Sequence, residues 1–328
     1  MKKRQKLSQW VVLFFLFSML TLWALSVGWA QQYPSKPVTF QVHNAAGGST
    51  DVGMRILCSF AEKILGQPMP VVNRVGGGGV VSYTQIARST PDGYLIGSWA
   101  SPVTAGIMLD PKRKVSFGPS DYTYIINHVY DPNVICVRND SPFKALPDLI
   151  KAAKEQPGKI SMAVCGKLGD DHLVAIDLQR RAGVKFNIVH FDSSAPGKSA
   201  VLGGHVQVYL GNQGDVPTHM KDGSFRMLAI ADKAKSVKYP NIPLLMDFGY
   251  PVVGASARGI AGPKGLSKDI LYTLEAAFKK ATEDPAHIER MEKMGLPIRF
   301  MGSNEYTEFL AQDFKRVAEL IPEAMKAP

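Results

Sequence analysis

A glycine pair followed by hydroxyl and carboxyl side chains is the first candidate ligand-binding pattern in the chain. Residues 38–42 alternate β-branched and aromatic side chains, which is typical of a strand, and Gly47-Gly48 permits a sharp turn after it. Residues 49–51 (Ser-Thr-Asp) are all good helix N-caps, and helical apolar spacing begins at Val52. Free backbone N–H groups and the helix dipole favour an anion at such a helix start. The turn is therefore predicted to bind an anion; the alternative is a β–α turn without a ligand.

Three later strand ends carry polar residues in the same arrangement. Strands are expected at residues 94–99, 159–164 and 187–191, and each is followed by a loop and a predicted helix. Ligands in α/β folds bind beyond the carboxyl ends of strands, so these loops are expected to meet in one cleft between two domains. Trp99, at one of these ends, is expected either to form a wall of the cleft or to lie in the core.

Several segments match part of an enzyme motif but lack a residue that the motif needs. Gly197-Lys198-Ser199 matches the end of a P-loop, yet Asp192 stands where that motif needs glycine. Asp170, Asp171 and His172 are adjacent, so on a helix they point in different directions; capping by Asp170 is expected rather than metal binding. There is no G-x-S-x-G and no H-E-x-x-H. No catalytic residue, metal site or cofactor is predicted.

The first thirty residues have the composition of a secretory signal peptide. Four basic residues precede an apolar run over residues 10–27, and Gly28 and Ala30 are the small residues of a cleavage site after Ala30. The apolar run is close to the length that spans a bilayer, so an uncleaved anchor is the alternative. The sequence predicts an exported protein whose mature chain begins at Gln31.

Charge and cysteine usage exclude some further classes. The formal net charge of +10 falls to about +6 without the four basic residues of the leader, and no basic run is interleaved with aromatics, so nucleic-acid binding is not expected. The three cysteines, Cys58, Cys136 and Cys165, contain no C-x-x-C pair, which makes zinc improbable. One disulfide of undetermined pairing is left open.

Strand and helix signals alternate along nearly the whole chain, which predicts an α/β fold. Two neighbouring strands are expected at residues 122–130 and 134–138, joined by the turn Asp131-Pro132-Asn133. Residues 240–262 are expected to be rich in loops, with short strands only, and helices are expected in the remaining tail.

Short motifs in a fixed order identify a family. They include Tyr33-Pro34-Ser35-Lys36-Pro37, Ala46-Gly47-Gly48-Ser49-Thr50-Asp51, Leu65-Gly66-Gln67-Pro68, Pro91-Asp92-Gly93-Tyr94 and Leu202-Gly203-Gly204-His205-Val206. In this order and spacing, the sequence resembles the extracytoplasmic solute receptors of the tripartite tricarboxylate transporter, the Bug family, over nearly all of the mature chain.

The resemblance implies a two-domain periplasmic binding protein of the Venus-flytrap, type II-like kind. Domain 1 would comprise residues 31–130 and 251–328, and domain 2 residues 131–250. A small organic carboxylate would bind between them, and the monomeric receptor would deliver it to membrane permease subunits. Together, the turns and the resemblance predict these ligand-binding residues: Asn44, Gly47, Gly48, Ser49, Thr50, Asp51, Ser98, Trp99, Ser101, Gly166, Lys167, Gly169, Asp170, His172, Phe191, Asp192, Ser193 and Ser194.

The loops at residues 165–171 and 190–193 depart from the family pattern and contain acidic residues, so the ligand class is left open. Asp170, Asp171 and Asp192 would repel an anion unless they are paired, and Lys167 or His190 could pair with them. The alternative is a receptor or sensor of the same fold for an amino acid, an amide or an aromatic acid, with Trp99 as a stacking wall. A secreted enzyme is the remote alternative.

Overall fold

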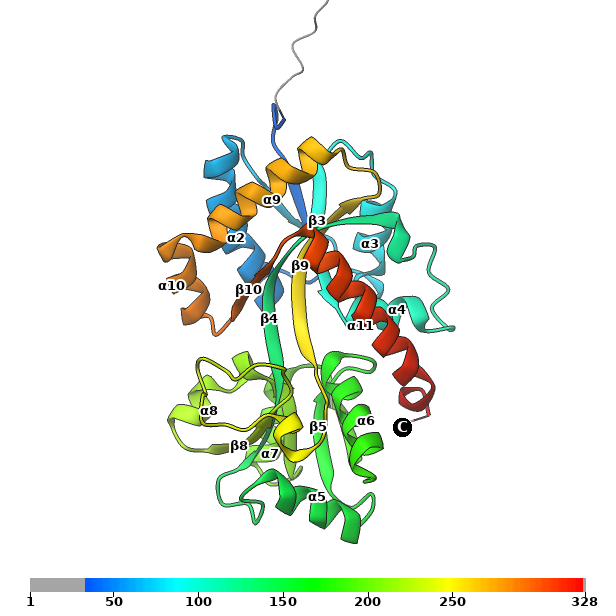
Figure 1. Cartoon of the computed structure of the whole chain (residues 1–328), viewed down its shortest axis with the longest axis vertical. Helices are drawn as coiled ribbons and strands as arrows, with labels where there is room; N and C mark the ends of the chain where they lie inside the picture. The colour runs from blue at the N-terminus through cyan, green and yellow to red at the C-terminus, as the bar shows by residue number, and fades with distance from the viewer. Residues whose placement is uncertain (1–32, 327–328) are drawn as a thin grey trace, which may run out of the picture.

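The computed structural model describes residues 33–326, which form two lobes joined by long strands (Figure 1). The upper lobe in the view of Figure 1, lobe one, contains the first strands and helices of the described chain, and the lower, lobe two, contains its middle. The C-terminal end of the chain reaches down beside lobe two. The predicted signal peptide, residues 1–30, lies outside the described residues. The predicted α/β class with two lobes is confirmed.

One ten-stranded sheet runs through both lobes. Its main order is β2-β1-β3-β9-β4-β7-β5-β6, and β10 and β8 also pair with β4. The strands β1–β3 pair in parallel in lobe one, as do β5–β7 in lobe two, whereas β4 and β9 run antiparallel to their neighbours. The bounds are β1 Thr39–Val42, β2 Val71–Asn73, β3 Leu95–Ser101, β4 Tyr122–Arg138, β5 Ser161–Cys165, β6 Asn187–Phe191, β7 Val208–Asn212, β8 Phe225–Ile230, β9 Ala255–Pro263 and β10 Ile298–Met301.

The connection between the lobes differs from the prediction. The two strands expected around Asp131-Pro132-Asn133 are one continuous strand, β4, which pairs with β9 as far as Pro132 and with β7 from Asn133 onward. Proline's fixed φ is compatible with a strand, and its missing N–H falls where β4 changes partners, so the proline does not end the strand. The predicted turn at these residues is therefore wrong.

The nine-residue strand β9 occupies a segment that was expected to be mostly loop. Its small residues gave a weak strand signal, but they are needed for packing. A Cβ on Gly259 would lie 2.3 Å from the carbonyl oxygen of Ile126 and 2.5 Å from the Tyr306 ring. The close approach of β4 and α11 to Gly259 thus explains a composition that gives only a weak strand signal.

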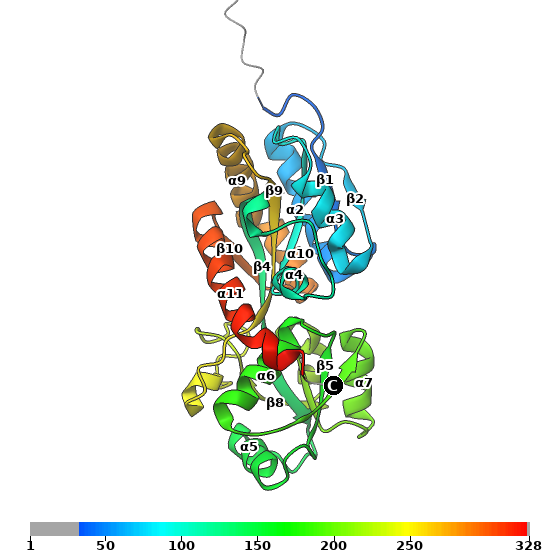
Figure 2. The same ribbon diagram turned by 90° about the vertical axis from the view of Figure 1, so that its right-hand side faces the viewer.

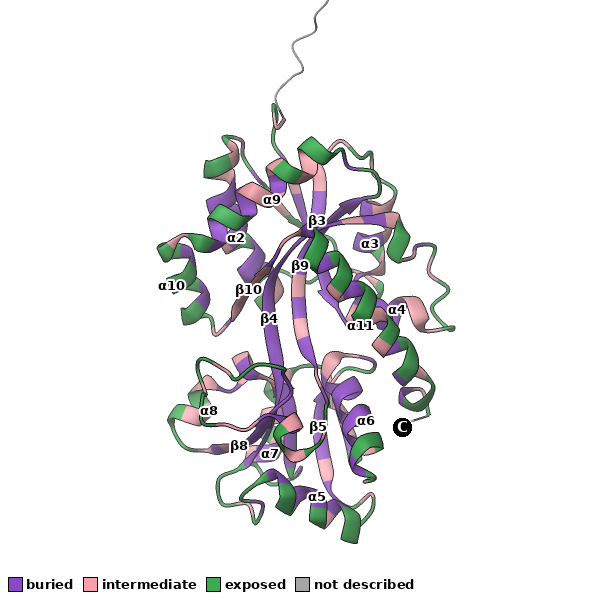
Figure 3. Cartoon of the chain, viewed as in Figure 1, coloured by how far each residue is buried: buried purple, intermediate pink, exposed green. Residues whose placement is uncertain are grey.

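Helices cover the sheet on both faces, and the strands between them are largely buried (Figure 3). In lobe one, α2 and α9 pack on one face, and α3, α4 and α11 on the other, where Trp99 and five tyrosines meet. The helix bounds are α2 Ser49–Leu65, α3 Val80–Ala87, α4 Val103–Leu109, α5 Leu146–Glu155, α6 Asp170–Ala182, α7 Ser194–Leu202, α8 Pro217–Lys221, α9 Lys268–Glu283, α10 Pro285–Lys293 and α11 Ser303–Ala324.

The last helix, α11, crosses from one lobe to the other (Figure 2). Tyr306 and Leu310 pack in the aromatic core of lobe one, whereas Val317 and Leu320 belong to the core of lobe two with Leu173 of α6. The lobes therefore share a third connection besides β4 and β9. Within residues 33–326, no helix combines the length and hydropathy needed to cross a bilayer.

Candidate functional site

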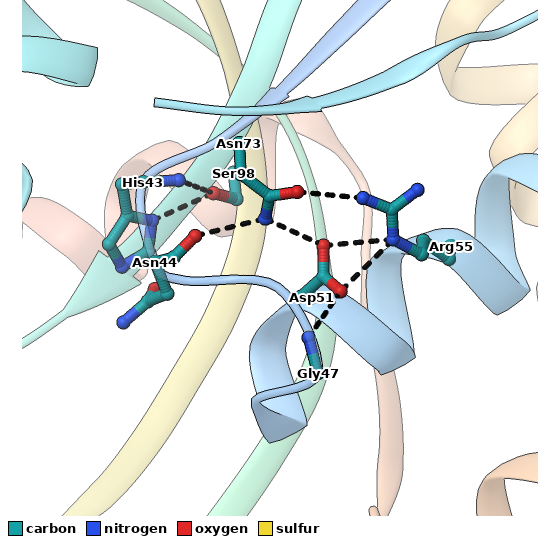
Figure 4. A network of polar contacts seen from close by, with 7 residues as sticks. All are labelled: His43, Asn44, Gly47, Asp51, Arg55, Asn73 and Ser98. Carbon is teal, nitrogen blue, oxygen red and sulfur yellow. Dashed lines mark hydrogen bonds and ion pairs between the residues drawn. The ribbon is translucent and has the colours of Figure 1, made fainter. Parts of the chain in front are cut away.

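The first predicted turn is organised by the carboxylate of Asp51, which is only 2% exposed (Figure 4). Its Oδ2 accepts a hydrogen bond from the Gly47 N–H at 2.9 Å, and its Oδ1 accepts one from Asn73 Nδ2 at 2.8 Å. Arg55 Nε donates to both oxygens at 3.0 Å. The N-cap of α2 is Gly48, without a side-chain cap, so the expected capping by residues 49–51 is wrong. The acid ties the turn to its neighbours instead.

These contacts account for the charge of Asp51. Burial works against the ionised carboxyl, but hydrogen bonds from Arg55, Gly47 and Asn73 outweigh it and hold the pKa of Asp51 below its usual range. Asn73 also donates to the Asn44 carbonyl at 2.9 Å and accepts from Arg55 at 2.7 Å. The negative charge of Asp51 is therefore balanced by Arg55 and by hydrogen-bond donors of the same network. Residues 44–49 are exposed, so the start of α2 is open to solvent.

Sequence reasoning missed Arg55 and Asn73, the two partners that hold the turn. Arg55 had a local signal, since it lies four residues after Asp51 on the same helix face. Asn73 follows 22 residues later at the end of β2, and only the parallel pairing of β1 with β2 brings it to the turn.

His43 and Ser98 meet beside this turn. Ser98 Oγ accepts from the His43 backbone N–H at 3.2 Å and lies 2.7 Å from its Nδ1. The Ser98 hydroxyl thus contacts both the backbone and the ring of His43. Burial lowers the pKa of His43 to about 4, and the charge of Arg258 contributes to the lowering. The imidazole is neutral at physiological pH.

Trp99 and Ser101 point to the opposite face of β3, because side chains alternate along a strand. The ring of Trp99 makes edge contacts with Tyr122 and Tyr124, at centroid distances of 4.5 and 5.2 Å. The Ser101 hydroxyl donates to Asp313 of α11. Both residues line a cavity of about 370 Å³ beneath α11. The structure does not bring them together with Ser98 and the α2 turn.

The α6 turn in lobe two is held by its own acids and by the side-chain amides of Asn133 and Asn212. Asp171 Oδ2 accepts from the Cys165 N–H at 3.0 Å. Asp170 Oδ2 accepts from Asn133 at 2.8 Å and from Asn212 at 2.7 Å. The N-cap of α6 is Gly169, without a side-chain cap, so the prediction that Asp170 caps the helix is wrong. The side-chain amides of Asn133 and Asn212 bind this carboxylate in place of the helix end.

The remaining predicted residues of lobe two gather around the same turn. Gly166 and Lys167 are exposed, and His172 Nδ1 accepts from the Leu168 N–H at 3.1 Å. Burial, the neighbouring His190 and Lys167 lower the pKa of His172 to about 4. The neutral imidazole of His172 thus helps to hold the α6 turn in place.

The α7 turn lies next to the α6 turn, because Cys165 and Phe191 are partners in the pairing of β5 with β6. His190 Nδ1 lies 3.1 Å from the Gly166 carbonyl oxygen and joins the two loops. Asp192 and Ser193 are exposed and Ser194 begins α7, whereas Phe191 packs half-buried against the core of lobe two.

The acidic groups of lobe two lie close enough to influence one another. The side-chain amide of Asn133 donates hydrogen bonds to Asp170 and Asp171, and that of Asn212 donates one to Asp170. Burial raises the pKa of Asp171 well above its usual value, with Asp170 adding to the rise. Burial also raises the pKa of Asp131 to about 7, against the charge of Arg258. Within the described residues, no three His, Cys, Asp or Glu side chains form a metal-binding group.

Sequence reasoning also missed Arg258 of β9. It pairs across the sheet with Ala100 and Val129, and its Nε donates to Ser256 Oγ at 3.2 Å. The available signal was a lone charge within a stretch of small and apolar residues, because buried charges are rare unless they have a role.

A known family accounts for this arrangement. The profile described as "Tripartite tricarboxylate transporter family receptor" (TctC) matches residues 54–325. The chain belongs to this family. Its relatives include "UPF0065 protein in gbd 5'region" of Cupriavidus necator, 32% identical over 89% of this chain and 88% of that one. "Protein BugT" of Bordetella pertussis is 30% identical over 90% of this chain and 91% of its own. The chain is thus a substrate-binding receptor of a periplasmic family, not an enzyme.

Solved structures of the same fold agree. A TctC solute-binding protein from Polaromonas, without ligand, has a TM-score of 0.80 at 26% identity and covers 89% of this receptor and 99% of its own chain. MatC from Rhodopseudomonas palustris with bound malate has a TM-score of 0.72 at 22% identity, covering 88% and 100%. An R. palustris protein with adipate has 0.72 at 21%, covering 90% and 99%. At these lower identities, the last two show the fold alone.

Proposed function

We propose that the receptor binds a small organic carboxylate between its lobes and delivers it to the permease subunits of a tripartite tricarboxylate-type transporter. The main observation in support of this proposal is the geometry of the α2 turn. Asp51, the buried acid of this turn, accepts hydrogen bonds from Arg55, Asn73 and the Gly47 N–H, while the helix start itself stays exposed. Exposed N–H groups at the positive end of a helix dipole favour a carboxylate.

Lobe two supplies the opposing contacts in this proposal. The starts of α6 and α7 present Gly166, Gly169, Ser193 and Ser194 next to one another. The two strands that cross between the lobes, β4 and β9, would act as the hinge, and closure around the solute would give the permease a form to distinguish from the open one. The malate and adipate bound by two proteins of the same fold are small dicarboxylates, which supports this substrate class.

A second candidate solute is an amino acid or amide. It is favoured by the partly exposed Asp170 at the start of α6, whose carboxyl could accept a hydrogen bond from an ammonium or amide group. In either case we propose export through a signal peptide cleaved after Ala30, a monomeric receptor, and the division into residues 31–130 plus 251–328 and residues 131–250.

The test is a thermal-shift screen of the chain from Gln31 onward, after unfolding and refolding to remove any retained solute. The panel holds di- and tricarboxylates, aromatic acids, amino acids and amides. A solute at 100 times its Kd stabilises the folded state by about 2.7 kcal/mol, which is a readily measured shift. Hits among simple carboxylates support the proposal. Hits confined to amino acids and amides favour the second candidate, and no hit at all contradicts both.

A further inference from the structure

The position of Arg258 gives it access to the face of the sheet where the solute is proposed to bind. Ile260, two residues further along β9, packs in the core beneath α2 with Phe40 and Met54. Alternate residues of a strand share a face, so Arg258 points to that same face. Ser98 is the partner of Ile260 in β3, and so the α2 turn, Ser98 and Arg258 lie on one side of the sheet.

Hinge residues lie on this side as well. Asp131 of β4 is the partner of Ser256, the residue that binds Arg258 Nε, and the charge of Arg258 lowers the pKa of both Asp131 and His43. The guanidinium is therefore close enough to act on groups of both the lobe-one turn and the strand that leads into lobe two.

The cation has no counter-ion in contact. Within residues 33–326, no carboxylate oxygen lies within 4 Å of the Arg258 guanidinium, in contrast to Arg55, Arg299 and Arg316, which all form ion pairs. Its Nη1 is buried and has no hydrogen-bond partner, and a buried unsatisfied donor on a charged group is costly. An anion bound at this face would remove that cost.

We propose that Arg258 is a specificity-determining residue that pairs with a carboxylate of the bound solute. This inference rests on the proposed function and goes beyond it, because it assigns the selection of acids over their amides to one side chain. The planar guanidinium presents a fork of N–H donors that matches two carboxylate oxygens, and Ser256 holds it in place. Helix N–H groups and hydroxyls alone would bind a carboxylate and a carboxamide with less discrimination.

The test compares Arg258→Gln and Arg258→Lys with the parent chain by isothermal titration with an acid from the screen and with its monoamide. Arg258→Gln is expected to weaken acid binding about 10- to 100-fold and amide binding far less, so the preference for the acid collapses. Arg258→Lys retains the charge but not the fork and is expected to fall between them. Arg226→Gln is the matched control, since Arg226 also has a buried Nη1 without a partner but lies on β8, at Asn139.

Each outcome of this comparison either supports or overturns the proposed role of Arg258. An unchanged acid-to-amide preference in Arg258→Gln overturns the role of Arg258 and leaves the proposed function intact. If Arg258→Gln does not fold, Arg258→Lys and the acid-to-amide ratio of the parent chain carry the test, and a parent ratio near one overturns it. If the parent chain binds no acid at all, the proposed function itself fails.

Discussion

Replacing Asp51 by asparagine removes a charge while retaining an oxygen that can accept from Gly47. The cost follows from the contacts of this 2%-exposed carboxylate, which include two distances of 3.0 Å to Arg55 Nε. Hydrogen bonds to charged groups contribute about 1.5 to 3 kcal/mol, and because Arg55 is 44% exposed, the lower half of that range applies. We expect Asp51→Asn to lower stability by about 2 kcal/mol, or about 4 to 8 °C in Tm if the lobe unfolds as one unit.

The pH dependence of this loss distinguishes a charge effect from a packing effect. Since the folded-state pKa of Asp51 is depressed, its stabilisation is present above the unfolded value of about 3.9 and is lost as the pH falls through the folded value. The Tm difference between the parent chain and Asp51→Asn should therefore be full at pH 7 and close towards pH 3. Asp269→Asn, an exposed acid in the first turn of α9, is the control and should show little difference at either pH. A Tm gap for Asp51→Asn that stays constant down to pH 3 would refute the reasoning.

Two further predictions concern the hinge. Because the folded-state pKa of Asp131 is raised to about 7, ionisation costs the folded state stability as the pH rises from about 4 to 7. Asp131→Asn should be more stable than the parent by on the order of 2 to 4 kcal/mol at pH 8 and equal to it below pH 4, as measured by urea unfolding of solute-free protein. Arg299 of lobe one pairs with the 5%-exposed Asp232 of lobe two at 2.8 Å and stacks over Tyr130. Arg299→Ala should cost about 1 to 3 kcal/mol in the same assay and Arg299→Lys less; equal costs would contradict a role for the guanidinium plane.

Most elements of the fold follow from local sequence, and the exceptions have a common cause. The helices predicted after the strands at residues 94–99, 159–164 and 187–191 are present as α4, α6 and α7, because apolar spacing acts within a few residues. The strands β4 and β9 are these exceptions. Proline and glycine discourage strands locally, but here β4 exchanges partners at Pro132 and Gly259 admits Ile126 at close range.

The candidate site shows the same division. The glycine-rich turns at residues 47–51 and 166–170 are visible in the sequence, and the structure places each at a helix start. The partners that define their charge are not visible. Asn73 reaches Asp51 through strand pairing, and Asn133 and Asn212 reach Asp170 through the hinge. Sequence proximity also grouped Trp99 with Ser98, whereas alternation along β3 puts them on opposite faces.

The α/β class, the family and the turns where helices begin after strands follow from the amino-acid sequence alone, since these depend on residue types and short spacings. The face of the sheet that each side chain occupies and the pairing of charges are set by the folded chain. Those properties depend on strands and helices that are distant in the chain, as with Asp51 and Asn73. Arg258 illustrates the difference: in the sequence it is one cation among many, and in the folded chain it is a charge on the hinge strand with no carboxylate of residues 33–326 in contact.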